Sequence, residues 1–166
     1  QLVSPIPYQK GQPLPRKFHL PPLTIEDLSI PAEGHSQAWT IGLLPHQIVT
    51  RKLLLEVPVV EGCFTAAPEQ DIAKLMVVER HGGPGTVGLG LLHGFGLKEG
   101  ALASSVAHDS HNLVVVGTDD RDMLLAAQKV GELGGGLAVA AQGEILGFLA
   151  LPIAGLMSEE PIDQVA

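Results

Sequence analysis

The feature of this sequence that most limits its fold is the shortness of its apolar segments. Most of these segments are rich in Val, Ile and Leu, alternate in part with polar residues and end at turn-forming residues, as β-strands do. Strands are therefore predicted at Ala38–Leu43, Gln47–Val57, Asp71–Glu79, Thr86–Phe95, Ala101–Val106 and Leu113–Val116, with a hairpin of Leu137–Ala141 and Glu144–Leu151 around Gln142 and Gly143. The longest apolar run, Ile145–Met157, is interrupted by Pro152 and is too short to cross a bilayer. A sheet-dominated fold follows, and no membrane partner is expected.

Helical spacing is clearest at Asp119–Leu133. Its apolar residues recur every three or four positions and share one face: Met123, Ala126, Ala127, Val130 and Leu133. Thr118 or Asp119 can cap the first turn, and Gly134 can end the helix. A second helix is predicted to open within Ser158–Ala166, with Ser158 as its cap. The predicted fold class is α+β, a mixed and mostly β-sheet domain with few helices.

Prolines divide the chain into two parts. Seven of the thirteen prolines lie within residues 1–34, and this part is predicted to be an extended, irregular arm because proline fixes φ and donates no backbone hydrogen bond. Residues 35–166 are then the folded domain. Five apolar residues could pack the arm onto a neighbour: Leu14, Phe18, Leu20, Leu23 and Ile25. Since the chain opens on Gln1 and its last predicted helix has no body, we expect a piece of a longer protein, truncated at its C-terminal end.

Charge and cysteine content exclude several classes of partner and site. The formal net charge is -8 and the basic residues are scattered, whereas nucleic acids and anionic membranes are bound by clustered Lys and Arg. Cys63 is the sole cysteine, so the chain can form neither an internal disulfide nor a cysteine-based zinc cluster. No basic segment followed by an apolar run marks a signal peptide at the start. These features fit a cytoplasmic protein that binds no nucleic acid.

The densest polar cluster is the HDSHN segment, residues 108–112, between two predicted buried strands. Two imidazoles beside a carboxylate and a hydroxyl can orient a substrate, relay a proton or contribute to a metal site. The alternative is a turn in which the Asp, Ser and Asn side chains bond to nearby backbone. His108, Asp109, Ser110 and His111 are candidate catalytic residues, and Asn112 is a candidate substrate-binding residue. Two His and one Asp do not complete a metal site, so no metal ligand is assigned.

The triplet Glu79-Arg80-His81 is the second candidate, at a predicted strand end directly before the glycine-rich segment Gly82–Gly85. Charged residues in this position can line a substrate-binding site, and the alternative is a surface strand end followed by a turn. The glycines of the chain match neither the GxGxxG dinucleotide fingerprint nor a P-loop, so a phosphate-binding loop is not expected.

Six blocks of the sequence resemble the C-terminal domain of bacterial and archaeal adenine deaminases. In chain order they are LPHQIVTRK (Leu44–Lys52), DIAKLMVVERH (Asp71–His81), VGLGLLHGFGLK (Val87–Lys98), ALASSVAHDSHNLVVVG (Ala101–Gly117), DDRDMLL (Asp119–Leu125) and LPIAGLMSEE (Leu151–Glu160). The HDSHN segment and LPIAGLMS are the most specific of them. The resemblance covers nearly the whole chain after the proline-rich arm.

This resemblance implies the amidohydrolase superfamily and the hydrolysis of adenine to hypoxanthine and ammonia. In such enzymes a hydroxide on a binuclear Mn or Fe centre attacks C6 of the purine, because coordination lowers the pKa of water. The family's metal ligands lie in a (β/α)8 barrel that precedes this domain. The present sequence has neither an HxH motif nor a barrel-length repeat. We therefore expect no catalytic barrel and no bound cofactor in this chain, and no activity from the chain by itself.

Three hypotheses about function follow. In the first, the chain is the C-terminal domain of an adenine deaminase and packs on or caps the preceding barrel, with adenine as the substrate and a homo-oligomer as the assembly. The HDSHN segment would then reach the barrel mouth, to contact the substrate or order its surroundings. In the second, the chain is a non-catalytic ligand-binding or oligomerisation module. In the third, it is a small metal hydrolase that uses His108, Asp109 and His111.

Overall fold

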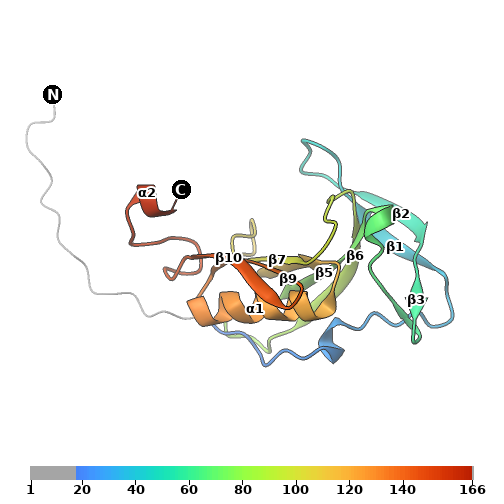
Figure 1. Ribbon diagram of the computed structural model, residues 1–166, viewed down its shortest axis with the longest axis horizontal. Helices are drawn as coiled ribbons and strands as arrows, with labels where there is room; N and C mark the ends of the chain where they lie inside the picture. Colours follow the sequence, from blue (N-terminus) through green and yellow to red (C-terminus); the bar gives the residue numbers. More distant parts are fainter. Residues whose placement is uncertain (1–17, 166) are drawn as a thin grey trace, which may run out of the picture.

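A broad β-sheet with one helix packed beneath it dominates the computed structural model, which describes residues 18–165 (Figure 1). Eight strands of this part form one sheet in the order β10-β9-β7-β8-β5-β6-β1-β2. Their bounds are β1 Gln37–Gly42, β2 Arg51–Glu56, β5 Ile72–Val78, β6 Val87–His93, β7 Ala101–Ser104, β8 Leu113–Gly117, β9 Gly136–Ala141 and β10 Glu144–Ala150. Among these strands the neighbours are antiparallel, except β1 and β6, which are parallel. The mixed, mostly β-sheet fold is confirmed, and the sheet is open rather than closed into a barrel.

The predicted central helix is confirmed as α1, Asp120–Leu133, and its ends follow the local signals. The side chain of Asp119 caps it by accepting hydrogen bonds from the backbone N–H groups of Arg121 and Asp122, at 2.9 and 3.1 Å. Gly134 ends it in the left-handed conformation, with φ of 73°. Four of the five predicted face residues are fully buried: Met123, Ala126, Ala127 and Val130. This face packs on β7, β8, β9 and β10.

Small side chains bring α1 close to the sheet. Four alanines of β7 and β9 that face the helix are at most 1% exposed: Ala101, Ala103, Ala138 and Ala140. Leu28 of the short helix η1, Glu26–Leu28, is fully buried in the same core. Phe18, Leu20 and Leu23 pack against it too, so this part of the arm lies on the domain itself, while Ile25 stays 41% exposed. Residues 1–17, with Leu14, lie outside the described part.

Between residues 47 and 70 the structure differs from the sequence-based expectation in three elements. The strand expected from Gln47 begins at Arg51, because the chain turns at His46, with φ of 59°. A hairpin of β3, Val59–Val60, and β4, Cys63–Phe64, was not predicted. A further short helix, η2, spans Pro68–Gln70.

The predicted cap of the last helix is wrong. α2 spans Ile162–Val165, and Ser158 instead accepts a hydrogen bond from the Glu160 N–H within a turn, at 3.1 Å. Pro161 disfavours helical backbone at the residue before it, so the helix begins only after the proline.

The β9–β10 hairpin is confirmed and shows where the chain needs glycine. Gln142 and Gly143 both have positive φ, 56° and 78°, as the tight turn of a two-residue hairpin requires. At the other end of the hairpin, a Cβ on Gly136 would lie 1.9 Å from the carbonyl oxygen of Leu149. No larger residue fits there without a shift of β10. Within the described residues, no helix has the length and apolar character needed to cross a membrane.

Candidate functional site

The HDSHN segment lies on the loop that joins β7 to β8. These strands pair antiparallel, so the polar residues between them leave the sheet at its end. The side chains of His108 and Asp109 are 86% and 103% exposed. Nδ1 of His108 lies 3.2 Å from Oδ1 of Asp109, and the ring centroids of His108 and His111 are 5.5 Å apart. The loop therefore presents an imidazole–carboxylate pair to any molecule that approaches it.

A buried arginine fixes the backbone of this loop. Arg80, directly after Glu79 at the end of β5, is 3% exposed. Its Nε donates a hydrogen bond to the carbonyl oxygen of His111, and its Nη2 donates one to the carbonyl oxygen of Ala154 at 2.9 Å. The ring centroid of Phe18 lies 4.8 Å from its guanidinium carbon. Burial lowers the pKa of Arg80, although an arginine remains protonated at neutral pH. Arg80 thus connects the HDSHN loop with the C-terminal loop and the arm.

His81 also holds the loop, and His111 lies within it. Nε2 of His81 lies 2.8 Å from the carbonyl oxygen of Ser110, which accepts its hydrogen bond. His111 has a φ of 50°, in the left-handed region where a non-glycine residue carries strain of about 1 kcal/mol. Nδ1 of His111 is buried and has no hydrogen-bond partner among the described residues. Because a buried unpaired nitrogen is unfavourable, this atom stands to gain most from a further partner.

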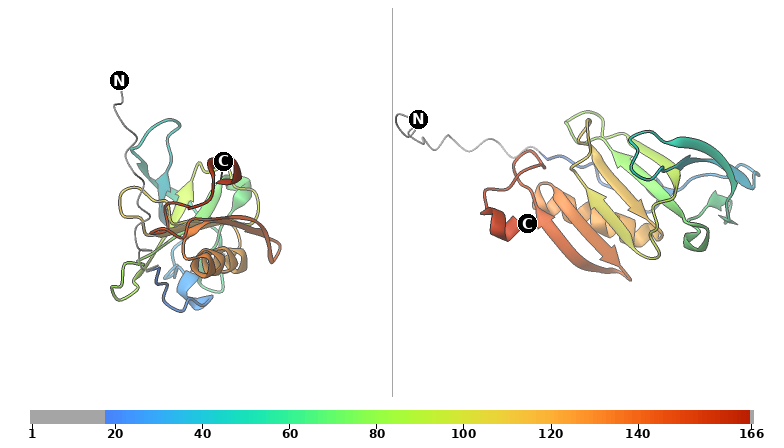
Figure 2. Two further views of the ribbon diagram at one scale, coloured as in Figure 1. Left: turned by 90° about the vertical axis from the view of Figure 1, so that its left-hand side faces the viewer. Right: turned by 90° about the horizontal axis from the view of Figure 1, so that it is seen from above.

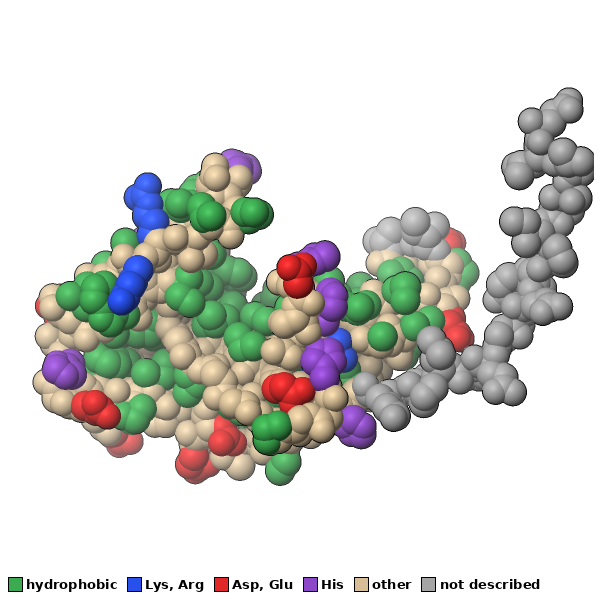
Figure 3. All heavy atoms as spheres, turned by 180° about the vertical axis from the view of Figure 1, so that it is seen from behind, with side chains coloured by type: hydrophobic (Ala, Val, Ile, Leu, Met, Phe, Trp, Pro, Cys, Tyr) green, Lys and Arg blue, Asp and Glu red, His purple; other side chains and the backbone are tan. Residues whose placement is uncertain are grey.

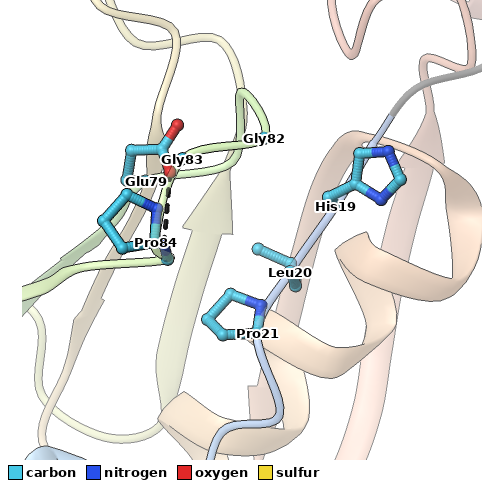
Figure 4. Close-up of a pocket in the computed structure, with 8 residues that line it drawn as sticks. His19, Leu20, Pro21, Glu79, Gly82, Gly83 and Pro84 are labelled. Carbon is cyan, nitrogen blue, oxygen red and sulfur yellow. Dashed lines mark hydrogen bonds between the residues drawn. The ribbon is translucent and has the colours of Figure 1, made fainter.

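Glu79 organises the glycine-rich segment that follows it. Its Oε1 accepts a hydrogen bond from the His81 N–H at 2.6 Å, and its Oε2 accepts one from the Gly85 N–H at 3.4 Å. The bond from His81 is the main reason why the pKa of Glu79 lies below its usual value. A cleft of about 440 Å³ separates this segment from the arm, with Leu20 and Pro21 on its far side (Figure 4). Glu79 lines the cleft, but its carboxylate is occupied by hydrogen bonds from nearby backbone N–H groups.

The C-terminal loop, which contains LPIAGLMS, lies against the HDSHN loop. Ser105 is fully buried, and its Oγ donates to the carbonyl oxygen of Gly155 at 2.6 Å and accepts from the Gly136 N–H at 2.8 Å. Together with the bond from Arg80 to Ala154, these contacts join the two most specific blocks of the resemblance. The sequence did not single out Ser105, because a serine at a strand end carries no signal of its own.

The structure brings most of the candidate residues into one region. Arg80 and His81 contact the HDSHN loop directly, while Glu79 faces the glycine-rich segment. Asn112 is half-buried and donates its backbone N–H to Oγ of Ser110 at 3.4 Å, as the turn hypothesis expects. The loop is therefore both a hydrogen-bonded turn and a display of exposed polar side chains.

Metal chemistry does not fit the described residues. In residues 18–165, no group of three or more His, Cys, Asp or Glu side chains is placed to hold a metal ion. His108 and Asp109 contact each other, and the nearby His81 bonds to a backbone oxygen. The binuclear centre that the resemblance implies is thus not matched by these residues, and no metal-dependent step is assigned to them.

Comparisons with known proteins point to one family. Residues 47–166 match the model of the adenine deaminase C-terminal domain. The chain is 58% identical over 140 residues to "Adenine deaminase 2" of Carboxydothermus hydrogenoformans, covering 84% of this chain and 24% of that protein. It is 50% identical over 147 residues to the adenine deaminase of Oleidesulfovibrio alaskensis, covering 89% and 26%. It is 45% identical over 165 residues to the adenine deaminase of Gluconobacter oxydans, covering 99% of this chain and 28% of that protein. The chain spans about a quarter of the length of these relatives.

Proposed function

This chain belongs to the adenine deaminase C-terminal domain family, and we propose that it serves an enzyme that hydrolyses adenine to hypoxanthine and ammonia. Its share is the part that packs on, and caps, a preceding metal-dependent barrel. The relatives support this division, because about three-quarters of their length lies outside the matched region. The described residues offer no metal group of their own. The attacking water and its metal therefore belong to the barrel.

Within that enzyme, we assign the HDSHN loop to the mouth of the barrel, where His108 contacts the purine. The observation that carries this assignment is an exposed His108–Asp109 pair on a loop whose backbone is held by Arg80 and His81. A rigid loop with exposed polar tips is suited to contact a ligand that another domain holds.

The geometry of the pair suggests how His108 meets adenine. When Nδ1–H of His108 donates to Asp109, the neutral ring is left with Nε2 as an acceptor. An acceptor in this position suits the exocyclic amino group of adenine, which donates hydrogen bonds. A protonated ring would instead donate from Nε2, which suits the departing ammonia nitrogen. Asp109 orients the imidazole for either contact.

The test uses the longer polypeptide in which this domain follows the barrel. His108→Ala is expected to lower kcat/KM for adenine by about a hundredfold or more, because a positioned acid–base group contributes roughly 10²- to 10⁴-fold, with metal content unchanged. Asp109→Asn should give a smaller loss in the same direction. His35→Ala is the control, because His35 is exposed and lies outside the loop. If both loop variants keep wild-type kinetics, the HDSHN segment has a structural role and does not contact the substrate.

A second measurement tests the division of labour. The 166-residue chain alone, supplied with adenine and Mn(II), is expected to release no hypoxanthine above background, since its described residues hold no metal group. Strong turnover by the chain alone would overturn the proposal that catalysis needs the barrel.

A further inference from the structure

The two faces of the sheet are covered very differently. α1, η1 and residues 18–28 lie on one face, and the β1–β2 loop, the HDSHN loop and the short α2 rise on the other (Figures 1 and 2). In the described part of the chain, no helix packs on this second face as α1 packs on the first. We call the second face the open face. The strand register places on it these apolar residues and glycines: Trp39, Ile41, Leu54, Leu75, Val77, Gly88, Gly90, Leu102, Val114, Leu137, Val139 and Leu149. Lys52 and Ser104 lie on it too, and Ala73, Leu92 and Val116 form a small buried cluster there with Leu43 and Leu97.

The open face is apolar across the width of the sheet. Trp39 is 59% exposed and pairs with Leu54, which is 48% exposed, and at the other side Val139 is 39% exposed. Between them lie half-buried aliphatics, two glycines of β6, Ser104 and the buried Ala73, Leu92 and Val116. Above Gly90 no heavy atom lies within 4 Å of an added Cβ. An apolar surface of this kind marks an interaction site rather than a surface made for water.

Two loops stand above the open face and make it a hollow. One is the β1–β2 loop, where Ile48 is fully exposed and Val49 is 58% exposed. The other is the HDSHN loop. Figure 3 shows apolar side chains on the floor between a projection that carries basic residues and one that carries histidines. A hollow with raised ends accepts a convex body, whereas two copies placed face to face would meet at their loops.

We propose that the open face is the docking surface for the catalytic part that precedes this domain in the same polypeptide. This inference rests on the proposed function. The length of the relatives supports the occupant, because the chain spans only about a quarter of them. Docking on this face puts the His108–Asp109 pair over the partner while it buries the apolar floor.

The chain offers a matched pair of probes for this docking. Trp39 and Phe148 are both 59% exposed, and each lies under a lysine, Lys52 at 3.9 Å and Lys129 at 4.9 Å. Trp39 belongs to the open face. Phe148 lies on the α1 side, because Lys129 is a residue of α1 and Ala138, its partner in β9, faces the helix.

Hydroxyl-radical footprinting reads both aromatics in unmodified protein, as the 166-residue chain and as the longer polypeptide. Oxidation of Trp39 is expected to fall at least about fivefold in the longer polypeptide, as for a side chain in an interface core, while oxidation of Phe148 stays within about twofold. Equal oxidation of Trp39 in both proteins would overturn the inference. Protection of Trp39 in the 166-residue chain alone, if it rises with protein concentration, would also overturn the inference. The open face would then bind a second copy of the chain.

A variant separates docking from folding. Gly90→Leu adds a side chain over the open face at a position with ordinary φ and free space, so the domain should keep its circular dichroism and unfolding midpoint. In the longer polypeptide it should restore Trp39 oxidation to within about twofold of the chain alone. Gln128→Leu on the exposed side of α1 is the control and should not. A folded Gly90→Leu protein with Trp39 still protected contradicts the inference. Deaminase activity of the longer polypeptide is measured in parallel. An active protein with unprotected Trp39 would contradict the docking surface alone. An inactive protein with protected Trp39 would contradict the proposed function alone.

Discussion

The covered face and the open face of the same sheet are built from different side chains. Under α1 the strands carry alanines that are almost completely buried, such as Ala103 and Ala138, and these let the helix approach closely. The open face carries larger residues, several of which stay exposed, such as Leu54 and Val139. Burial of apolar surface contributes roughly 25 cal/mol per Å², so the first face already stabilises this domain while the second still has surface to bury. The exposed apolar surface of the second face is the observation on which the proposed docking rests.

Polar groups divide in the same way. On the helix side, Nζ of the buried Lys74 bonds both oxygens of Asp120, at 2.8 and 2.9 Å, and the buried Asp122 accepts the N–H groups of Gln142 and Gly143. Above the open face, His108 and Asp109 project into solvent. The buried Lys74 and Asp122 are thus paired, whereas the side chains of His108 and Asp109 are exposed and contact only each other.

The largest expected difference between the two faces is in the stability lost when one large side chain on each face is truncated. Met123→Ala is expected to lower the free energy of unfolding by about 3 to 4 kcal/mol, because it leaves a cavity beneath α1. Leu54→Ala on the open face should lower it by less than about 1 kcal/mol. Urea unfolding of the 166-residue chain measures both. Similar losses from the two variants would mean that the open face also contributes to the core.

Removal of the acidic partner of Lys74 tests the pairing on the covered side. Asp120→Ala leaves a buried ammonium group without its carboxylate and is expected to cost about 3 kcal/mol. The matched control is Glu132→Ala, whose bridge to Lys129 is exposed and is worth less than about 0.5 kcal/mol. The comparison is again made by urea unfolding, and an equal response of the two variants would contradict the assigned role of Lys74.

Arg80 links the HDSHN loop with the C-terminal loop, and its removal should destabilise these loops more than the core. Arg80→Leu leaves the carbonyl oxygens of His111 and Ala154 without a donor, at a cost of about 2 kcal/mol. Hydrogen exchange should speed up most at the His111 amide, which bonds to the Ala107 carbonyl oxygen, and least at the Val115 amide in β8. Arg121→Leu, an exposed arginine on α1, is the control. Uniform acceleration over the whole sheet would argue against a local anchoring role.

The smallest effect is expected at Glu79, outside both faces. Hydrogen bonds hold its pKa in the folded protein below the usual value. The contribution of the carboxylate is therefore present above the usual pKa and is lost as pH falls through the lowered one. Amide chemical shifts of His81 and Gly85 should titrate in this acid range in the wild type and stay constant in Glu79→Gln. A titration that persists in Glu79→Gln would point to another carboxylate.

Prediction from sequence succeeded where a local rule governs the backbone. α1 followed from spacing, a capping aspartate and a terminal glycine, and the β9–β10 hairpin followed from Gln142 and Gly143. It failed where the signal was weak, at the start of β2, the β3–β4 hairpin and the start of α2. These segments contain residues that are compatible with several conformations, and their surroundings select one.

The candidate site shows the same limit. The HDSHN segment is conspicuous in the sequence, because a dense polar cluster between two apolar runs is unusual. The role of Arg80 cannot be seen in the sequence, because its hydrogen-bond partners lie 31 and 74 residues further along the chain. Spacing along a sequence contains no information about contacts between such distant segments. Arg80, a candidate substrate-binding residue, is found to hold the backbone of the HDSHN loop and the C-terminal loop.

The sequence by itself determined the class of the fold, the family and the polar loop, because strand-length apolar runs, helix caps and family blocks are local properties. Only the tertiary structure decided that the guanidinium of Arg80 lies inside, that the two most specific blocks touch and that one face of the sheet stays open. The physical reason is that burial depends on strand order. Alternation assigns neighbouring residues to opposite faces, and only the packing of α1 decides which of these faces is covered.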